Sequence, residues 1–174
     1  MKNVVLLLIS FLIVSSLSCS FIYDVSYDYE RNAELLGLRT YDWLPIPEGA
    51  GMDSLLTKRI NNSVDNQLES KGLRRTSDHP DFLIAMHVGT EEKVRYTDWG
   101  YRYGPYWRGP SYSKFKYQEG TLILDFVDSQ SKELIWRGVA KGFVDSGMTP
   151  KKRDKLVNEA VQKILENFPP PSSK

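Results

Sequence analysis

The only cysteine of this chain, Cys19, lies where an apolar N-terminal run ends, and it constrains how the rest can fold. The run has a charged start at Lys2, apolar residues over 4–14 and small polar residues after them, which is the pattern of a secretory signal. It is shorter than the roughly 20 apolar residues of a membrane-spanning helix. An exported chain with one cysteine has no internal disulfide, so the part after residues 1–18 must fold on its own core.

Two kinds of processing compete at Cys19. Ser16 and Ser18 form a small-x-small site at which ordinary signal peptidase would release a chain with a free cysteine. The string Ser16-Leu17-Ser18-Cys19 also resembles the bacterial lipobox, in which the cysteine is acylated, although Ser16 stands where lipoboxes usually carry leucine. Acylation would consume a thiol that has no disulfide partner. We therefore predict a lipoprotein signal peptide over 1–18, a lipidated (palmitate-type) Cys19 and a short tether over 19–20.

The net charge argues against two partners, which are nucleic acid and an anionic surface to which the whole domain would adhere. Removal of residues 1–18 takes away Lys2 and leaves 22 basic and 22 acidic side chains, so the mature chain has no net charge. A zero balance gives no electrostatic footprint for nucleic acid. The length suits one domain, which we place at 21–169, with a tail at 170–174.

Hydrophobic periodicity predicts five strands and two helices. The strands fall near 21–27, 38–44, 81–88, 120–127 and 133–139, the last two joined by a polar turn at 128–132. The helices run from about 54 to 71, with Asp53 as N-cap and Gly72 as C-terminal stop, and from Thr149-Pro150 to Phe168. Each helix has one apolar face, so we expect an α+β two-layer sandwich: a mainly antiparallel sheet of about five strands with two amphipathic helices on one face.

These elements carry a pattern of short motifs that resembles a known family. The motifs are Asp28, Thr40-Tyr41-Asp42-Trp43, Asp81-Phe82-Leu83-Ile84, Gly120-Thr121-Leu122, Val127-Asp128, Leu134-Ile135-Trp136-Arg137-Gly138 and Phe168-Pro169. Together they resemble the bacterial lipoprotein family called domain of unknown function 4136, over about 21–169. The resemblance implies an envelope lipoprotein with an α+β domain, and it brings no activity, cofactor or catalytic residue.

An aromatic stretch over 96–117 is the first candidate site. Its glycines and prolines exclude a regular helix, so we expect a loop or an irregular hairpin extension. Its rings could bind a glycan, a peptide or membrane headgroups; alternatively, the loop folds back over the open face of the sheet and closes the core. The candidate binding residues are Tyr96, Trp99, Tyr101, Tyr103, Tyr106 and Trp107 with the cations Arg102 and Arg108. Lys114 and Lys116 add to the positive charge.

A second basic cluster, Lys151-Lys152-Arg153, lies in the first turn of the last helix, where cations oppose the helix dipole. It is either a solvated helix end partly balanced by Asp154 or a contact for an anionic surface.

Catalytic motifs are lacking, so we expect no enzyme, no metal site and no cofactor. His79 precedes a proline in a turn, and His87 falls in an apolar strand as a core histidine rather than a metal ligand. Asp125 could be a carboxylate with a raised pKa, but strand parity places it and Asp128 on opposite faces, which makes a poor acid and base pair. Asp128 is better interpreted as a turn former.

The leading hypothesis is a lipid-anchored protein of the cell envelope with a non-catalytic binding or scaffolding domain. Its partners would be the membrane, through the N-terminal lipid, and an envelope glycan or protein, with no nucleic acid. Ser20, by resemblance to enterobacterial sorting, favours the outer membrane on its periplasmic side over the inner membrane. The alternatives are a glycan-binding or glycan-modifying module that uses the 96–117 stretch, and a hydrolase that uses Asp125.

Overall fold

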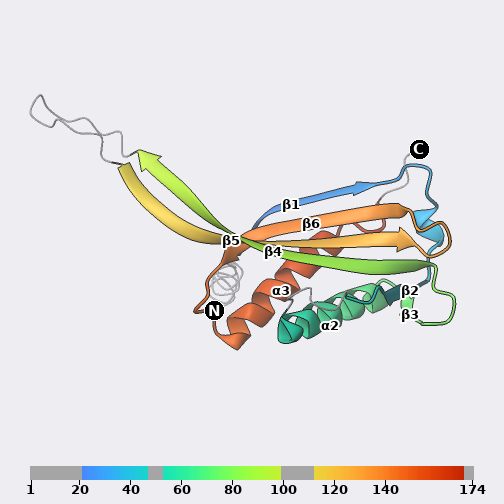
Figure 1. The fold of residues 1–174 in the computed structure, drawn as a ribbon. Helices are drawn as coiled ribbons and strands as arrows, with labels where there is room; N and C mark the ends of the chain where they lie inside the picture. Colours follow the sequence, from blue (N-terminus) through green and yellow to red (C-terminus); the bar gives the residue numbers. More distant parts are fainter. Residues whose placement is uncertain (1–20, 47–52, 99–111, 171–174) are drawn as a thin grey trace, which may run out of the picture.

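Alternating apolar residues build a six-stranded sheet, and two amphipathic helices cover one of its faces (Figure 1). The computed structural model describes residues 21–46, 53–98 and 112–170. The predicted α+β two-layer sandwich is confirmed. The strands are β1 (Ile22–Tyr29), β2 (Thr40–Trp43), β3 (Arg74–Arg75), β4 (Phe82–Asp98), β5 (Tyr112–Asp128) and β6 (Leu134–Val144); the helices are the short η1 (Leu35–Gly37), α2 (Ser54–Ser70) and α3 (Pro150–Leu165).

The strand order is β1-β6-β5-β4-β2-β3. In this order the pairs β1–β6, β6–β5 and β5–β4 are antiparallel. Strand β2 is parallel to both β4 and β3, so the sheet is mixed. We expected about five strands; the additional one, β3, consists of two exposed arginines, which have no apolar alternation to reveal a strand.

Both helices begin where capping chemistry predicts, and α2 also ends there, whereas α3 ends at Leu165, three residues before the predicted Phe168. The Asp53 carboxylate accepts hydrogen bonds from the backbone N–H groups of Leu55 and Leu56 at the start of α2. Thr149 caps α3 in the same way, with Pro150 as its first residue. Gly72 follows α2 with a φ of +85°, a conformation that glycine adopts without penalty.

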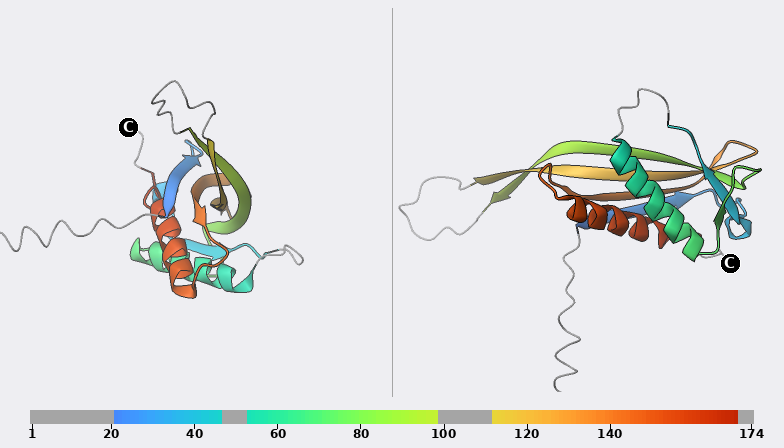
Figure 2. Two further views of the ribbon diagram at one scale, coloured as in Figure 1. Left: turned by 90° about the vertical axis from the view of Figure 1, so that its left-hand side faces the viewer. Right: turned by 90° about the horizontal axis from the view of Figure 1, so that it is seen from below.

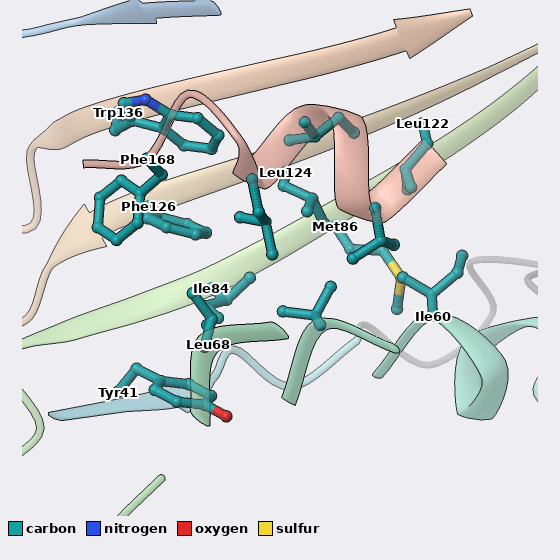
Figure 3. Close-up of a cluster of buried hydrophobic side chains, with 14 of the residues drawn as sticks. Tyr41, Ile60, Leu68, Ile84, Met86, Leu122, Leu124, Phe126, Trp136 and Phe168 are labelled. Carbon is teal, nitrogen blue, oxygen red and sulfur yellow. The ribbon is translucent and has the colours of Figure 1, made fainter. Parts of the chain in front are cut away.

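The core lies between the sheet and the helices, and aromatic side chains fill one end of it (Figure 3). Phe82, Phe126, Trp136 and Phe168 are all buried. The centre of the Phe126 ring lies 4.7 Å from that of each of the other three, and the Trp136 and Phe168 ring centres are 5.3 Å apart. Gly138 makes room for them, because a β-carbon there would lie 2.4 Å from the Trp136 ring. The Trp136-Arg137-Gly138 motif therefore has a packing function.

Strands β4 and β5 continue past the rest of the sheet as a two-stranded arm (Figures 1 and 2). Their register is unbroken from Phe82↔Asp128 to Asp98↔Tyr112, whereas β6 pairs with β5 only as far as Gln118. We define the arm as residues 93–98 and 112–117. The prediction that the strand beginning near 81 ends at Val88 was wrong, since β4 runs on to Asp98. The arm sequence does carry the period of a strand, because Val94 and Tyr96 alternate with Lys93 and Arg95, and Phe115 and Tyr117 alternate with Lys114 and Lys116.

Candidate functional site

The start of β1 is clamped to α3. The backbone N–H groups of Phe21 and Ile22 both donate to the Glu159 carboxylate, each at 3.3 Å. The Lys163 ammonium donates to the Ile22 carbonyl oxygen at 3.2 Å and lies 3.4 Å from Glu159. The Lys155 ammonium lies 5.7 Å from the centre of the Phe21 ring. The first residues of the domain, Phe21 and Ile22, are therefore held against α3.

Aromatic rings gather at the same end of the domain, where the arm leaves the body. We call Phe21, Phe115, Tyr117 and Phe143 the aromatic cluster, because all four line one pocket of about 680 Å³. Phe115 stacks on Tyr117 with ring centres 6.4 Å apart, and Tyr117 meets Phe143 edge to face at 5.1 Å. Phe115 is 62% exposed and Phe143 37% exposed. Exposed rings that contact one another make this cluster a candidate interaction surface.

A second pocket, of about 250 Å³, lies nearby between the sheet and the first turns of the two helices. We call it the interlayer pocket. Ile22 at the start of β1 lines it, as do Leu56 of α2 and Leu156 of α3. Its walls are almost entirely apolar, and Arg153 is its one lining cation among the described residues.

A charged row crosses the open face of the sheet. Asp125 is 5% exposed although no helix covers it, because Arg137 from the neighbouring strand lies over it. The guanidinium binds both carboxylate oxygens at 2.6 Å, and this hydrogen bonding raises the pKa of Arg137. His87 Nε2 lies 3.6 Å from Asp125 Oδ2. The expectation of a core histidine was wrong: the His87 side chain is 63% exposed, since its parity turns it to the uncovered face.

Asp128 does form the turn after β5, as predicted. Its carboxylate accepts hydrogen bonds from the backbone N–H groups of Gln130 and Ser131, and these lower its pKa. Asp125 and Asp128 have separate partners and do not form an acid and base pair. Among the described residues, no group of three or more His, Cys, Asp or Glu side chains could hold a metal ion.

Asp65, which has no recognisable motif in the sequence, organises the Thr40-Tyr41-Asp42-Trp43 motif. The Tyr41 hydroxyl and the Trp43 indole N–H both donate to Asp65 Oδ1 at 3.0 Å. Arg75 bridges the two acids, with Nε 2.9 Å from Asp42 Oδ1 and Nη1 3.6 Å from Asp65 Oδ2. Burial and the Asp65 hydrogen bond raise the pKa of Tyr41 above its usual range, so it stays a donor. This network ties the parallel strand β2 to α2.

Replacement of Asp65 by alanine is expected to lower the free energy of unfolding by about 2–3 kcal/mol. Tyr41 is completely buried, so its hydroxyl would lose the acceptor that the Asp65 carboxylate provides. Urea titration followed by circular dichroism measures the change. Asp154→Ala is the matched control, because it removes an exposed ion pair with Arg59 and should cost less than about 1 kcal/mol. Equal losses would contradict a structural role for Asp65.

Of the predicted binding residues, only Tyr96 is among the described residues, and it is part of β4. Trp99, Tyr101, Arg102, Tyr103, Tyr106, Trp107 and Arg108 lie outside the described residues, as does Cys19. The described part of the stretch is a regular arm that points away from the body, so it does not fold back over the sheet (Figure 2). Lys116 is paired, with its ammonium 2.6 Å from Glu92 Oε1.

The basic cluster at the start of α3, Lys151-Lys152-Arg153, was expected to be partly balanced by Asp154, but Asp154 forms its ion pair with α2. Asp154 binds Arg59 of α2 at 2.5 Å, so it links the two helices and does not serve only to balance its neighbours. Lys151 and Lys152 are exposed, and Arg153 turns toward the interlayer pocket.

Comparison with known proteins gives a family and a fold. The model of the family described as Domain of unknown function (DUF4136) matches residues 25–170. No curated protein matches the chain in sequence. Neither helix in the described part of the chain is long and apolar enough to cross a membrane.

Among solved structures, a PDZ domain protein from Parabacteroides distasonis aligns with a TM-score of 0.59 and 15% identity, over 88% of this chain and 37% of that chain. This chain thus spans little more than a third of that protein. The PelC dodecamer from Paraburkholderia phytofirmans aligns with a TM-score of 0.46 and 11% identity, over 82% of this chain and 94% of that one. At 15% identity, the similarity to the first protein shows a shared fold alone. The second alignment, with a TM-score of 0.46, supports no conclusion about this chain.

Proposed function

The chain belongs to the DUF4136 family, and from that premise we propose that it is a lipid-anchored protein of the cell envelope whose domain binds or scaffolds a partner at the membrane surface without catalysing a reaction. The anchor is an acylated Cys19, on the periplasmic side of the outer membrane. The family carries no assigned activity, so the proposal depends on the geometry at the start of β1.

The observation that carries the proposal is that the aromatic cluster lies at the fixed start of the domain. Cys19 precedes Phe21 by two residues, so its α-carbon lies no more than about 7 Å from that of Phe21. The Glu159 clamp holds Phe21 against α3, which leaves no long tether to move the domain away from the lipid. Acyl chains at Cys19 would therefore bring the exposed Phe115 and Phe143 rings to the bilayer interface.

Aromatic side chains are suited to that interface, because their faces are apolar and they tolerate contact with headgroups. The Arg137 pair with Asp125 supports a non-catalytic domain: both carboxylate oxygens are bound by one guanidinium, which leaves that carboxylate poorly placed to exchange a proton with a substrate. The glycan-binding alternative rests on residues 99–108, which lie outside the described chain.

Replacement of Phe115 by serine is expected to weaken binding to phospholipid vesicles about fivefold, because a large exposed ring would no longer enter the interface. The test uses the Cys19→Ser chain, so that the lipid anchor does not mask the contribution of the ring, and vesicles of phosphatidylethanolamine and phosphatidylglycerol in a sedimentation assay.

Leu36→Ser is the matched control. Leu36 is 55% exposed, but it lies in η1 at the opposite end of the domain (Figure 1). We expect it to leave vesicle binding unchanged. If the two variants bind vesicles equally well, the aromatic cluster does not face the membrane and the proposed orientation is wrong.

A further inference from the structure

We propose that the interlayer pocket binds the acyl chain of a single-chain anionic amphiphile, such as a medium-chain fatty acid, with its head group at Arg153. This goes beyond a role at the membrane surface, and it does not require Cys19 to be acylated. The walls of the pocket, its volume and the charge beside it support this ligand.

The walls select an apolar ligand. Leu122 and Ala140 line the pocket from the sheet, and Ile60 and Val157 line it from α2 and α3. Such walls offer a ligand few hydrogen-bond partners, so a sugar or a peptide backbone would lose its hydrogen bonds to water on entering. A hydrocarbon chain loses none.

Two glycines border the hollow, and neighbouring side chains pack directly over them: a β-carbon on Gly120 would lie 2.4 Å from Val144 Cγ2, and one on Gly142 would lie 2.7 Å from Ile22 Cδ1. On the helix-facing side of β5 and β6, Phe126 is paired with Trp136 at one end, and these rings fill the space between sheet and helices. At the other end of the same strands Gly120 is paired with Gly142, and both line the pocket. Apolar walls without packing partners make the fold less stable, so a hydrocarbon in this space would restore lost contacts.

The volume limits the size of the ligand. An apolar cavity of about 150 Å³ accommodates benzene, with six carbon atoms. By proportion, the 250 Å³ of this pocket corresponds to about ten carbon atoms. One medium-length chain fits, whereas the two long chains of a phospholipid do not.

The charge at the pocket favours an anionic head group. Arg153 lines the pocket, and the ion pairs found among the described residues do not include its guanidinium. Two acids are close to it: Asp145, which also lines the pocket and accepts a hydrogen bond from the Gly147 N–H, and Asp53, which caps α2 and whose pKa is lowered by its capping hydrogen bonds and also by the Arg153 charge. Because no ion pair of Arg153 is found among the described residues, its guanidinium can receive the carboxylate head group of a ligand.

Calorimetric titration of the Cys19→Ser chain with three ten-carbon probes tests the inference. We expect decanoate to bind with one-to-one stoichiometry, decanol about threefold more weakly, and decyltrimethylammonium most weakly, because only decanoate pairs with Arg153. Absence of decanoate binding, or equal binding of the cationic probe, would overturn the proposal. Since Cys19 is absent from this chain, the result is independent of the lipid anchor.

Matched variants locate the site. Leu56→Trp places a larger side chain in the pocket and should lower decanoate affinity about tenfold, since each methylene excluded from an apolar site costs about fourfold. Leu55→Trp is its control, because Leu55 is 59% exposed and does not line the pocket. If circular dichroism shows that Leu56→Trp is unfolded, two charge variants test the site instead. Arg153→Gln should lower the affinity for decanoate about threefold and leave that for decanol unchanged, whereas Lys152→Gln should change neither affinity.

Vesicles of phosphatidylglycerol distinguish a free amphiphile from a bilayer lipid. We expect Leu56→Trp and Leu55→Trp to bind these vesicles equally. If Leu56→Trp lowers vesicle binding but not decanoate binding, the pocket takes a chain from the bilayer and the proposal of a single-chain ligand fails.

Discussion

Replacement of Cys19 by serine is expected to move the protein from the membrane fraction to the soluble fraction. Serine has no thiol to be acylated, and each buried methylene of an acyl chain contributes about 0.8 kcal/mol to membrane binding. Two or more acyl chains hold a protein stably at a membrane. The aromatic cluster alone would bury only a few partly exposed rings in the bilayer. Fractionation after palmitate labelling measures both effects at once: the label and the membrane association should disappear together.

Ser18→Ala is the control for that experiment, because alanine keeps a small residue before Cys19 and should preserve acylation. The mature N-terminus of the wild-type chain separates the two processing routes. A mass that corresponds to unmodified Cys19 would mean ordinary secretion, and a Cys19→Ser variant that stays in the membrane fraction would mean another anchor. Either result would refute the lipid-anchored function while leaving the fold and the interlayer pocket unaffected.

The helices and the β5–β6 hairpin could be predicted from the sequence because their signals are local. Asp53, Gly72 and Thr149 mark helix ends through hydrogen bonds within a few residues, and Asp128 does the same for its turn. The apolar stripe of each helix shows directly which face is buried.

The features that could not be predicted depend on partners far along the chain. Asp65 acquires its role only when β2 lies beside α2, which places Tyr41 and Trp43 within reach of its carboxylate. The two exposed arginines of β3 become a strand only through pairing with β2. No local pattern reports such contacts.

The candidate site shows the same division. The aromatic residues over 96–117 are conspicuous in the sequence, but Phe21 and Phe143 belong to the aromatic cluster only because β1, β5 and β6 bring them together. The Gly120 and Gly142 pair is likewise visible only in the register, and each glycine alone resembles an ordinary strand position. His87 was misplaced because an apolar strand in a two-layer fold still has one face open to solvent.

Replacement of Phe168 by alanine is expected to lower the free energy of unfolding by about 3–5 kcal/mol. Phe168 lies beyond the end of α3, yet it is 1% exposed, and its ring contacts Phe126 at 4.7 Å and Trp136 at 5.3 Å. Alanine would leave a cavity among rigid rings that cannot collapse to fill it. In a domain of this size the midpoint of thermal unfolding should fall by roughly 10 °C.

Phe115→Ala removes the same atoms from a ring that is 62% exposed, so it should change the midpoint by little more than about 1 °C. The comparison separates two uses of phenylalanine in one chain: Phe168 closes the core, whereas Phe115 is held at the surface at a cost in solubility that only an interaction would offset. If both variants lose the same stability, Phe115 is part of the core and the membrane-facing role of the aromatic cluster loses its basis. If neither loses stability, the packing around Phe168 does not hold the sheet and helices together.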